Sequence, residues 1–143
     1  MDFEKAFDTI EHEALWTVLA DQSVDVAYID LLKTLYRKQT ATVVAGTESR
    51  VFTLQRGVKQ GDPISALLFI CVMEAIFRTL KIKWQSLNTR RKGQYYGLVI
   101  DEPQQLLTNL RFADDVLSIV FCKRDVATKI ADLRNEACKY WWP

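Results

Sequence analysis

Apolar residues recur at helical spacing in several parts of the chain. Asp8 and Glu11 have the spacing of a capping box, which predicts that a first helix begins at Asp8. The apolar stripe of this helix is Ala14, Leu15, Val18 and Leu19. Two further helices are predicted over residues 25–38 and 125–140. Their stripes are Val26, Ile29, Leu32 and Leu35, and Val126, Ile130, Leu133 and Ala137.

Runs of β-branched and apolar residues predict short strands. Residues 40–44 and 51–54 flank a turn at Gly46 and have the pattern of a hairpin. Residues 96–100 predict another short strand, and two apolar runs flank the pair Asp114-Asp115. Helices alternating with antiparallel strands predict an α+β fold, with one antiparallel sheet backed by helices.

A glycine-rich loop precedes a fourth predicted helix. Gly57 and Gly61 would allow the backbone to approach a ligand closely, and Asp62 and Pro63 are typical of a helix N-cap and first residue. The apolar stripe of this helix is Ile64, Leu67, Leu68, Cys71, Ala75 and Ile76. The positive end of the helix would favour a bound phosphate. The alternative is an ordinary glycine loop before a core helix.

The pair Asp114-Asp115 is predicted at a hairpin tip, where carboxylates emerge from apolar strands. With Asp2 on a neighbouring strand, these carboxylates would form a site for two hard divalent cations. Taken alone, the pair is more typical of ordinary turn chemistry, which requires no metal.

Three segments in order resemble the palm of reverse transcriptases, the RNA-directed DNA polymerases, of the non-LTR (LINE-type) retrotransposon and group II intron branch. These segments are MDFEKAFD at 1–8, RGVKQGDPISALLF at 56–69 and LRFADDVLSI at 110–119. The similarity covers nearly all of the chain and is weaker over 81–106. Ala66 departs from the pattern, because the family usually has a second proline there.

The resemblance implies a role for each matching residue. Asp2, Asp114 and Asp115 would be the catalytic residues and the ligands of two Mg²⁺ ions, for which Mn²⁺ could substitute. Phe3, Phe7, Gln60 and Gly61 would contact the incoming nucleotide. The ring of Phe7 would lie under the sugar and exclude a 2′-hydroxyl, although a core aromatic is the alternative. The implied partners are an RNA template, a DNA primer and deoxynucleoside triphosphates.

Positive charge is scattered rather than concentrated. The net charge of +1 is low for a protein that binds nucleic acid. Local cations could contact phosphates of a template or triphosphate, or could simply be solvated surface. These candidates are Arg56, Lys59, Arg90, Arg91 and Lys92, and the last three fall in a polar stretch, 84–95, that predicts a surface insertion.

The remaining composition narrows the class of protein. The 143 residues are 49% hydrophobic, enough for one domain with a core. The three cysteines lack metal-ligand spacing and are predicted to be reduced packing residues, and His12 is predicted to be a surface or capping residue. No apolar run approaches the ~20 residues of a membrane span. We therefore expect a soluble intracellular protein, and the resemblance is compatible with a nuclear location.

The 143 residues match only part of the family's polymerase domain, which bears on whether the isolated chain is active. Asp2 has almost no strand before it, and the fingers and thumb of the family are missing. We therefore expect residues 1–143 to form a single partial domain of a longer polyprotein that is inactive in isolation. The alternative is a non-catalytic reverse-transcriptase-like module that binds RNA or protein. An unrelated metal-dependent phosphotransferase is disfavoured, because the segment Gln-Gly-Asp-Pro at 60–63 would have no matching role in such an enzyme.

Overall fold

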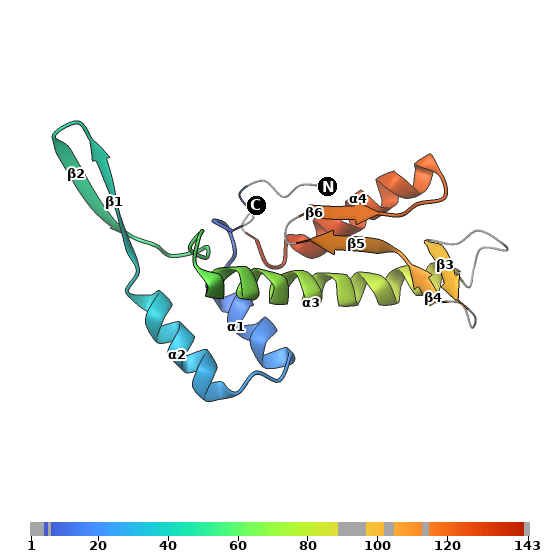
Figure 1. Ribbon diagram of the computed structural model, residues 1–143, viewed down its shortest axis with the longest axis horizontal. Helices are drawn as coiled ribbons and strands as arrows, with labels where there is room; N and C mark the ends of the chain where they lie inside the picture. Colours follow the sequence, from blue (N-terminus) through green and yellow to red (C-terminus); the bar gives the residue numbers. More distant parts are fainter. Residues whose placement is uncertain (1–4, 6, 89–96, 102–104, 113–114, 142–143) are drawn as a thin grey trace.

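The computed structural model describes residues 5, 7–88, 97–101, 105–112 and 115–141 (Figure 1). These residues form both helices and antiparallel strands, which confirms the α+β class. The helices are α1 (His12–Asp21), α2 (Val26–Arg37), α3 (Pro63–Asn88) and α4 (Lys123–Ala137). The strands are β1 (Thr40–Ala45), β2 (Glu48–Thr53), β3 (Leu98–Asp101), β4 (Gln105–Leu107), β5 (Asn109–Phe112) and β6 (Asp115–Ser118).

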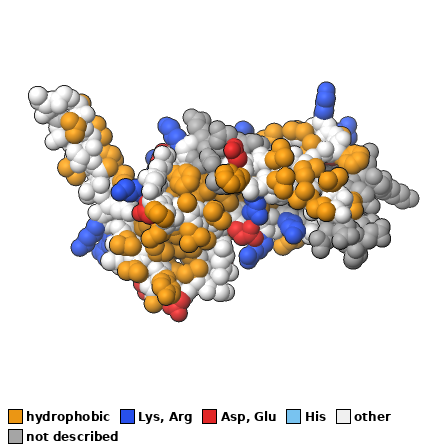
Figure 2. All heavy atoms as spheres, in the orientation of Figure 1, with side chains coloured by type: hydrophobic (Ala, Val, Ile, Leu, Met, Phe, Trp, Pro, Cys, Tyr) orange, Lys and Arg blue, Asp and Glu red, His pale blue; other side chains and the backbone are white. Residues whose placement is uncertain are grey.

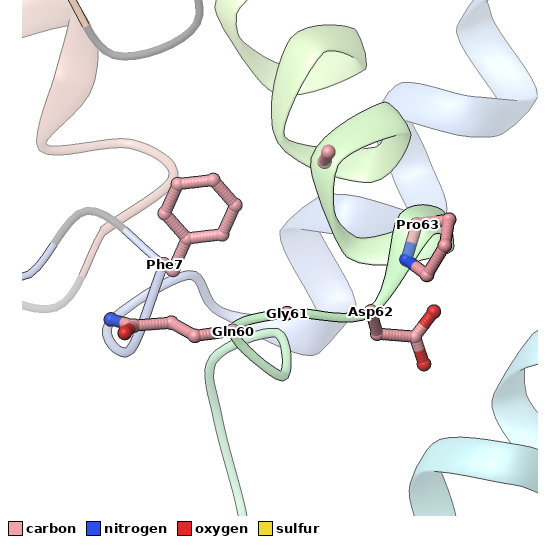
Figure 3. A pocket seen from close by; sticks show the side chains of 6 residues that line it. Phe7, Gln60, Gly61, Asp62 and Pro63 are labelled. Carbon is pink, nitrogen blue, oxygen red and sulfur yellow. The ribbon is translucent and has the colours of Figure 1, made fainter.

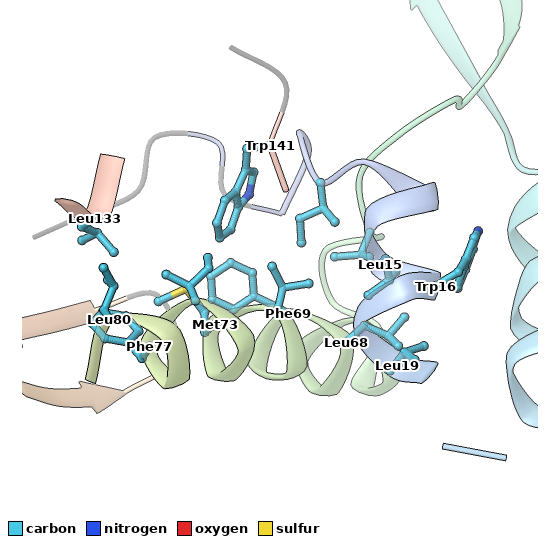
Figure 4. Close-up of a cluster of buried hydrophobic side chains, with 14 of the residues drawn as sticks. Leu15, Trp16, Leu19, Leu68, Phe69, Met73, Phe77, Leu80, Leu133 and Trp141 are labelled. Carbon is cyan, nitrogen blue, oxygen red and sulfur yellow. The ribbon is translucent and has the colours of Figure 1, made fainter. Parts of the chain in front are cut away.

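Helix α3 is the long central element, and α1, α4 and the hairpin β5–β6 lie along it (Figure 1). Its buried side chains recur every three or four residues, so that they form one face. They are Ser65, Leu68, Phe69, Val72, Met73, Ile76, Phe77, Leu80 and Trp84. Leu15 and Leu19 of α1, Leu133 of α4 and Trp141 pack in the same core cluster (Figure 4). Burying each large apolar side chain contributes about 1.5–3 kcal/mol.

The buried face of α3 differs from the predicted stripe. Leu68 and Ile76 are buried as expected, but Ile64 and Leu67 are 45% and 61% exposed. The helix also continues through residue 84 to Asn88, and Trp84 is fully buried. The predicted surface insertion therefore does not begin at Trp84, and residues 89–95 lie outside the described part of the chain. The apolar residues of 63–84 cover more than one face, and hydropathy alone does not indicate which face packs.

The start of α1 was predicted wrongly, whereas α2 begins as expected. The α1 N-cap is Glu11, without a side-chain hydrogen bond, and Asp8 lies in a preceding turn in which its N–H donates to the Lys5 carbonyl at 3.0 Å. In α2, the Asp25 carboxylate accepts from the Ala27 N–H at 2.8 Å. Ile29 is buried in α2, but Val26 and Leu35 are exposed.

The strands pair as three separate two-stranded antiparallel sheets within the described residues. We expected one sheet backed by helices, and this continuous sheet is not present there. The predicted hairpin around Gly46 is confirmed as β1–β2, which projects from the helices (Figure 1). The hairpin that carries the aspartate pair is confirmed as β5–β6, with Phe112 opposite Asp115. The turn at 113–114 lies outside the described residues.

The face that α4 buries is also different from the prediction. Leu133 is buried, but Val126 and Ile130 are 40% and 41% exposed. Polar residues take their place, because Asp125, Lys129 and Asp132 are buried. The predicted stripe is therefore correct for Leu133 and for Ala137, which packs against the core, and wrong for Val126 and Ile130. The buried polar residues of α4 instead make hydrogen bonds and ionic contacts.

Two compositional predictions are corrected by the structure. The segment Pro63–Leu87 of α3 contains an 18-residue window with a mean hydropathy of 1.8, so by length and composition the helix is apolar enough to cross a bilayer, contrary to our expectation. Its most apolar window is 44% buried, and the core helix of a soluble protein meets the same criterion. The three cysteines are free as expected, but only Cys71 is partly buried, whereas Cys122 and Cys138 are exposed.

Candidate functional site

Backbone hydrogen bonds join the loop before α3 to the segment before α1. The Gly57 N–H donates to the Ile10 carbonyl at 2.8 Å, and the Val58 N–H donates to the Phe7 carbonyl at 2.6 Å. Both Gly57 and Val58 are buried. Two segments that are distant in the sequence are therefore fixed against each other by main-chain contacts.

Gly57 is required at this junction for steric reasons. Its φ of +82° is in the region that favours glycine, and a Cβ atom there would lie 2.5 Å from the Asp8 carbonyl oxygen. We expected Gly57 to allow close approach to a ligand, but it instead allows close approach to this chain's own backbone. Gly61 also has a positive φ, +83°, but a Cβ there would meet nothing within 4 Å. Of the two glycines, Gly61 is therefore the one with open space beside it.

His12 fixes the same loop from α1. Its Nε2 lies 2.8 Å from the Gly57 carbonyl oxygen, and its ring contacts Trp16 and Tyr36. Burial raises the pKa of Tyr36, whose hydroxyl lies 3.4 Å from that of Ser65 in the first turn of α3. His12 is thus partly buried and hydrogen-bonded, not the surface or capping residue that we expected.

Phe7 connects this junction to the core. Its ring stacks on that of Phe69, with centroids 4.6 Å apart and an interplanar angle of 17°. The Trp141 ring packs edge-on against the same Phe69 ring, with the ring centroids 6.3 Å apart. The backbone of Trp141 pairs with Ile10. Phe7 is only partly buried, so its ring is held by the core while part of it faces outward.

An open pocket of about 560 Å³ lies between Phe7 and the start of α3 (Figure 3). The loop supplies Gln60 and Gly61, and the helix supplies Pro63 and Ala66. The Gln60 side chain is exposed, and its amide nitrogen lies 3.5 Å from both carboxylate oxygens of Asp8. The pocket therefore combines an aromatic wall, an amide and a glycine backbone.

The N-terminus of α3 borders this pocket. The Asp62 carboxylate accepts from the Ile64 N–H at 2.9 Å, which confirms Asp62 as N-cap and Pro63 as first helical residue. The end of a helix that carries unpaired N–H groups favours negative charge. Asp62 also lines the pocket, and in Figure 3 its carboxylate points away from Phe7.

Hairpin β5–β6 is anchored on α3 near the middle of the helix. The Arg111 guanidinium donates to the Glu74 carboxylate at 3.0 Å and lies 4.9 Å from the centre of the Phe77 ring. Val116, opposite Arg111 in the register, is buried. Asp115 starts β6 and is exposed.

The structure brings together only part of the predicted site. Phe7, Gln60 and Gly61 line one pocket. Arg56 and Lys59 are exposed in the adjoining loop. The other predicted residues lie outside the described part of the chain: Asp2, Phe3, Arg90, Arg91, Lys92 and Asp114. Within the described part, no group of three His, Cys, Asp or Glu residues could hold a metal ion.

Sequence reasoning missed the polar residues that fix these segments. Arg111 was read only as part of an apolar run, and Lys129 was not singled out. A signal for Lys129 was present, because it falls between Val126 and Leu133 on a helix that we expected to pack. A positive charge close to a predicted buried face requires a partner.

Comparison with known proteins identifies the family. The family model described as reverse transcriptase (RNA-dependent DNA polymerase) matches residues 1–141. The chain belongs to this family, which confirms the resemblance noted in the three sequence segments.

The relatives are proteins of mobile elements. Over 132 residues, 92% of the chain, it is 30% identical to a retrovirus-related Pol polyprotein from type-1 retrotransposable element R2 of Popillia japonica, covering 20% of that protein. Over 81 residues, 56% of the chain, it is 38% identical to such a polyprotein of Nasonia vitripennis, covering 8% of it. It is also 28% identical over 120 residues, 83% of the chain, to the Transposon TX1 uncharacterized 149 kDa protein of Xenopus laevis, covering 8% of it. The chain thus spans between 8% and 20% of the length of these relatives.

The junction at Gly57 leads to a stability prediction. We expect Gly57→Ala to lower the free energy of unfolding by about 2–4 kcal/mol, because the new methyl group meets the Asp8 backbone at a strained φ. Gly46→Ala is the matched control, since its φ is +65° with nothing within 4 Å. It should cost only about 1 kcal/mol. Urea unfolding measures both, and equal losses would contradict the steric account.

Proposed function

We propose that this chain supplies the nucleotide pocket and the catalytic carboxylates of an RNA-directed DNA polymerase. The reaction is transfer of a deoxynucleotide to a primer 3′-hydroxyl, with release of pyrophosphate. The observation that carries the proposal is the pocket in which Phe7 meets Gln60 and Gly61. These residues come from two of the three segments by which the chain resembles reverse transcriptases, and the hydrogen bonds of Gly57 and Val58 hold those segments together.

The donor set fits a divalent metal by its chemistry. Asp2, Asp114 and Asp115 offer only carboxylate oxygens, the ligands that Mg²⁺ prefers. Asp115 is exposed at the start of β6, so its carboxylate is accessible. Two bound Mg²⁺ ions would supply activation of the primer hydroxyl and neutralisation of the leaving pyrophosphate. Mn²⁺ could substitute for them.

The residues of the pocket would bind and orient the nucleotide. The N-terminal end of α3 attracts the negative triphosphate, and Gly61 leaves space for it. Gln60 can hydrogen-bond the nucleotide or the template base opposite it, and Phe3 adds to the same site. The Phe7 ring, fixed on Phe69, would lie under the sugar and exclude a 2′-hydroxyl.

The orientation of hairpin β5–β6 supports a shared site. Lys129 lies 4.4 Å from the centre of the Trp84 ring and donates to the Thr108 carbonyl, whereas Arg111 contacts Glu74. Strand β5 therefore runs from the level of Trp84 to the level of Glu74 along α3. This direction is towards the N-terminal end of α3, where the pocket lies (Figure 1).

An RNA template and a DNA primer are the proposed macromolecular partners. Arg56 and Lys59 adjoin the pocket and, with Arg90, Arg91 and Lys92, are the proposed phosphate contacts. Figure 2 shows lysine and arginine side chains dispersed over the visible face rather than gathered in one patch. We propose a soluble, intracellular protein, one partial palm domain of a longer polyprotein, and the family resemblance is compatible with a nuclear location.

A non-catalytic module that binds RNA or protein is the less favoured function. Such a module would not require carboxylates at all three positions, 2, 114 and 115, and the sequence has aspartate at each. A pocket beside a helix N-terminus also favours binding of an anionic triphosphate over contact with a protein surface, because the unpaired N–H groups there bind anions.

The proposal predicts that the chain binds a nucleotide in a metal-dependent way. We expect dGTP to bind in the presence of Mg²⁺, and the Asp114→Ala, Asp115→Ala double variant to bind about tenfold more weakly. Isothermal titration calorimetry measures both, and chelation of Mg²⁺ should weaken the wild type to the same degree. The double variant Asp21→Ala, Asp30→Ala removes two exposed carboxylates elsewhere and should bind like the wild type. Equal affinity in all three proteins would contradict the proposal.

The proposed role of Phe7 predicts a change in selectivity. Overpacking by a 2′-hydroxyl costs about 1–3 kcal/mol, which corresponds to a preference of about 5- to 150-fold for dGTP over GTP. We expect Phe7→Ala to remove most of this preference by improving GTP binding. Phe52→Ala, on the projecting hairpin β1–β2, should leave the preference intact. If Phe7→Ala retained the full preference, the ring would be a core aromatic only.

A further inference from the structure

A buried polar cluster connects α4 to the base of hairpin β5–β6. Lys129 and Asp125 are each only 1% exposed, and Asp132 is 8% exposed. Burial of a charged group is costly unless the group is paired and hydrogen-bonded. The contacts of Lys129 therefore require an explanation.

The Lys129 ammonium binds both strands of the hairpin at its open end. Its Nζ donates to the Thr108 carbonyl at 3.0 Å and to the Ile119 carbonyl at 2.7 Å. Thr108 directly precedes β5, and Ile119 directly follows β6. The same Thr108 carbonyl accepts the Ile119 N–H at 3.0 Å. One side chain thus joins the two ends of the hairpin to each other and to α4.

The cluster is attached in turn to α3. The Lys129 ammonium lies 4.4 Å from the centre of the Trp84 ring, and the Trp84 indole N–H donates to the Asp132 carboxylate at 3.0 Å. Lys83 donates to the other oxygen of Asp132 at 2.6 Å. The position of the hairpin base relative to α3 therefore depends on polar contacts that pass through α4.

Burial of the Lys129 ammonium removes it from water, which disfavours its charged form. Burial lowers the pKa of Lys129 to about 8, against the opposing effect of Asp125 one turn earlier on α4. An apolar residue at 129 would avoid this desolvation but would leave the Ile119 carbonyl without its ammonium donor. The geometry is that of a fixed clamp rather than a solvated surface lysine.

We propose that Lys129 is a positioning residue that fixes the direction of the aspartate hairpin. It acts at the open end of β5–β6, whereas Arg111 anchors the hairpin nearer the turn through Glu74. Two anchors at different heights along α3 determine an orientation, which a single anchor does not. The functional consequence of this proposal rests on the proposed function, in which the turn of the hairpin presents the metal-binding carboxylates to the pocket.

Amide hydrogen exchange of the whole chain tests the clamp. In Lys129→Met we expect the protection of the Ile119 amide to fall about tenfold more than that of Val72, in the core of α3. Lys123→Met is the control, because Lys123 is exposed in the first turn of the same helix. If Lys129 only stabilised the protein in general, Lys129→Met would lower the protection of the Ile119 and Val72 amides equally. That result would overturn the proposal.

A second variant removes the buried Asp125 carboxylate, whose charge acts on Lys129, together with the lysine. The double variant Asp125→Asn, Lys129→Met removes both charges together and should show the same selective loss at Ile119. A uniform loss of protection in this variant would also overturn the clamp.

Mn²⁺ titration followed by NMR separates the clamp from the proposed function. We expect Mn²⁺ to broaden the Asp115 amide signal in the wild type, with the half-saturating concentration about fivefold higher in the folded Lys129 variants. Broadening with unchanged half-saturation would overturn the positioning of the carboxylates. No broadening in the wild type would instead overturn the proposed metal site, and the hydrogen-exchange comparison would still decide whether Lys129 is a clamp.

Discussion

The close packing of Gly57 against the Asp8 backbone is the constraint on which the candidate site depends. A side chain at 57 would separate the segment before α1 from the loop before α3, since its Cβ would lie 2.5 Å from the Asp8 carbonyl oxygen. The hydrogen bonds of Gly57 and Val58 form only at this distance. They place Phe7 beside Gln60, and without that contact the chain would have no pocket at the N-terminus of α3.

Helix α3 connects this pocket to the rest of the protein. Its first turn borders the pocket, Phe69 supports the Phe7 ring, and its middle and end hold the hairpin through Glu74 and Trp84. The aromatic contacts are apolar, whereas the hairpin combines the buried Val116 with ionic, cation–π and backbone hydrogen-bond contacts of Arg111 and Lys129. The pocket thus rests on the hydrophobic core, whereas the orientation of the hairpin depends on a few charged side chains that are specific in direction.

The sequence predicted local features well because their causes are local. The cap at Asp62, the hairpin around Gly46 and the strands beside Asp115 follow from turn and capping chemistry. The buried faces of α3 and α4 were predicted less well, because they depend on the partners of each helix. Lys129 and Asp132 are buried through contacts with Thr108 and Trp84, and helical periodicity does not indicate which partner a buried polar residue has. Residue patterns pointed to the aspartates and the glycine loop, and the resemblance to the remaining site residues. Only Phe7, Gln60 and Gly61 are brought together in the described part of the chain.

The central claim is that the aspartate hairpin and the pocket serve one nucleotide. The most direct measurement is the NMR spectrum of the chain with dGTP and substoichiometric Mn²⁺. The account predicts paramagnetic broadening of both the Asp115 and the Gly61 amide signals, and loss of both effects in the Asp114→Ala, Asp115→Ala variant. Broadening at Asp115 with an unaffected Gly61 signal, while dGTP is bound, would contradict it. The two segments would then be separate features of the fold rather than one site.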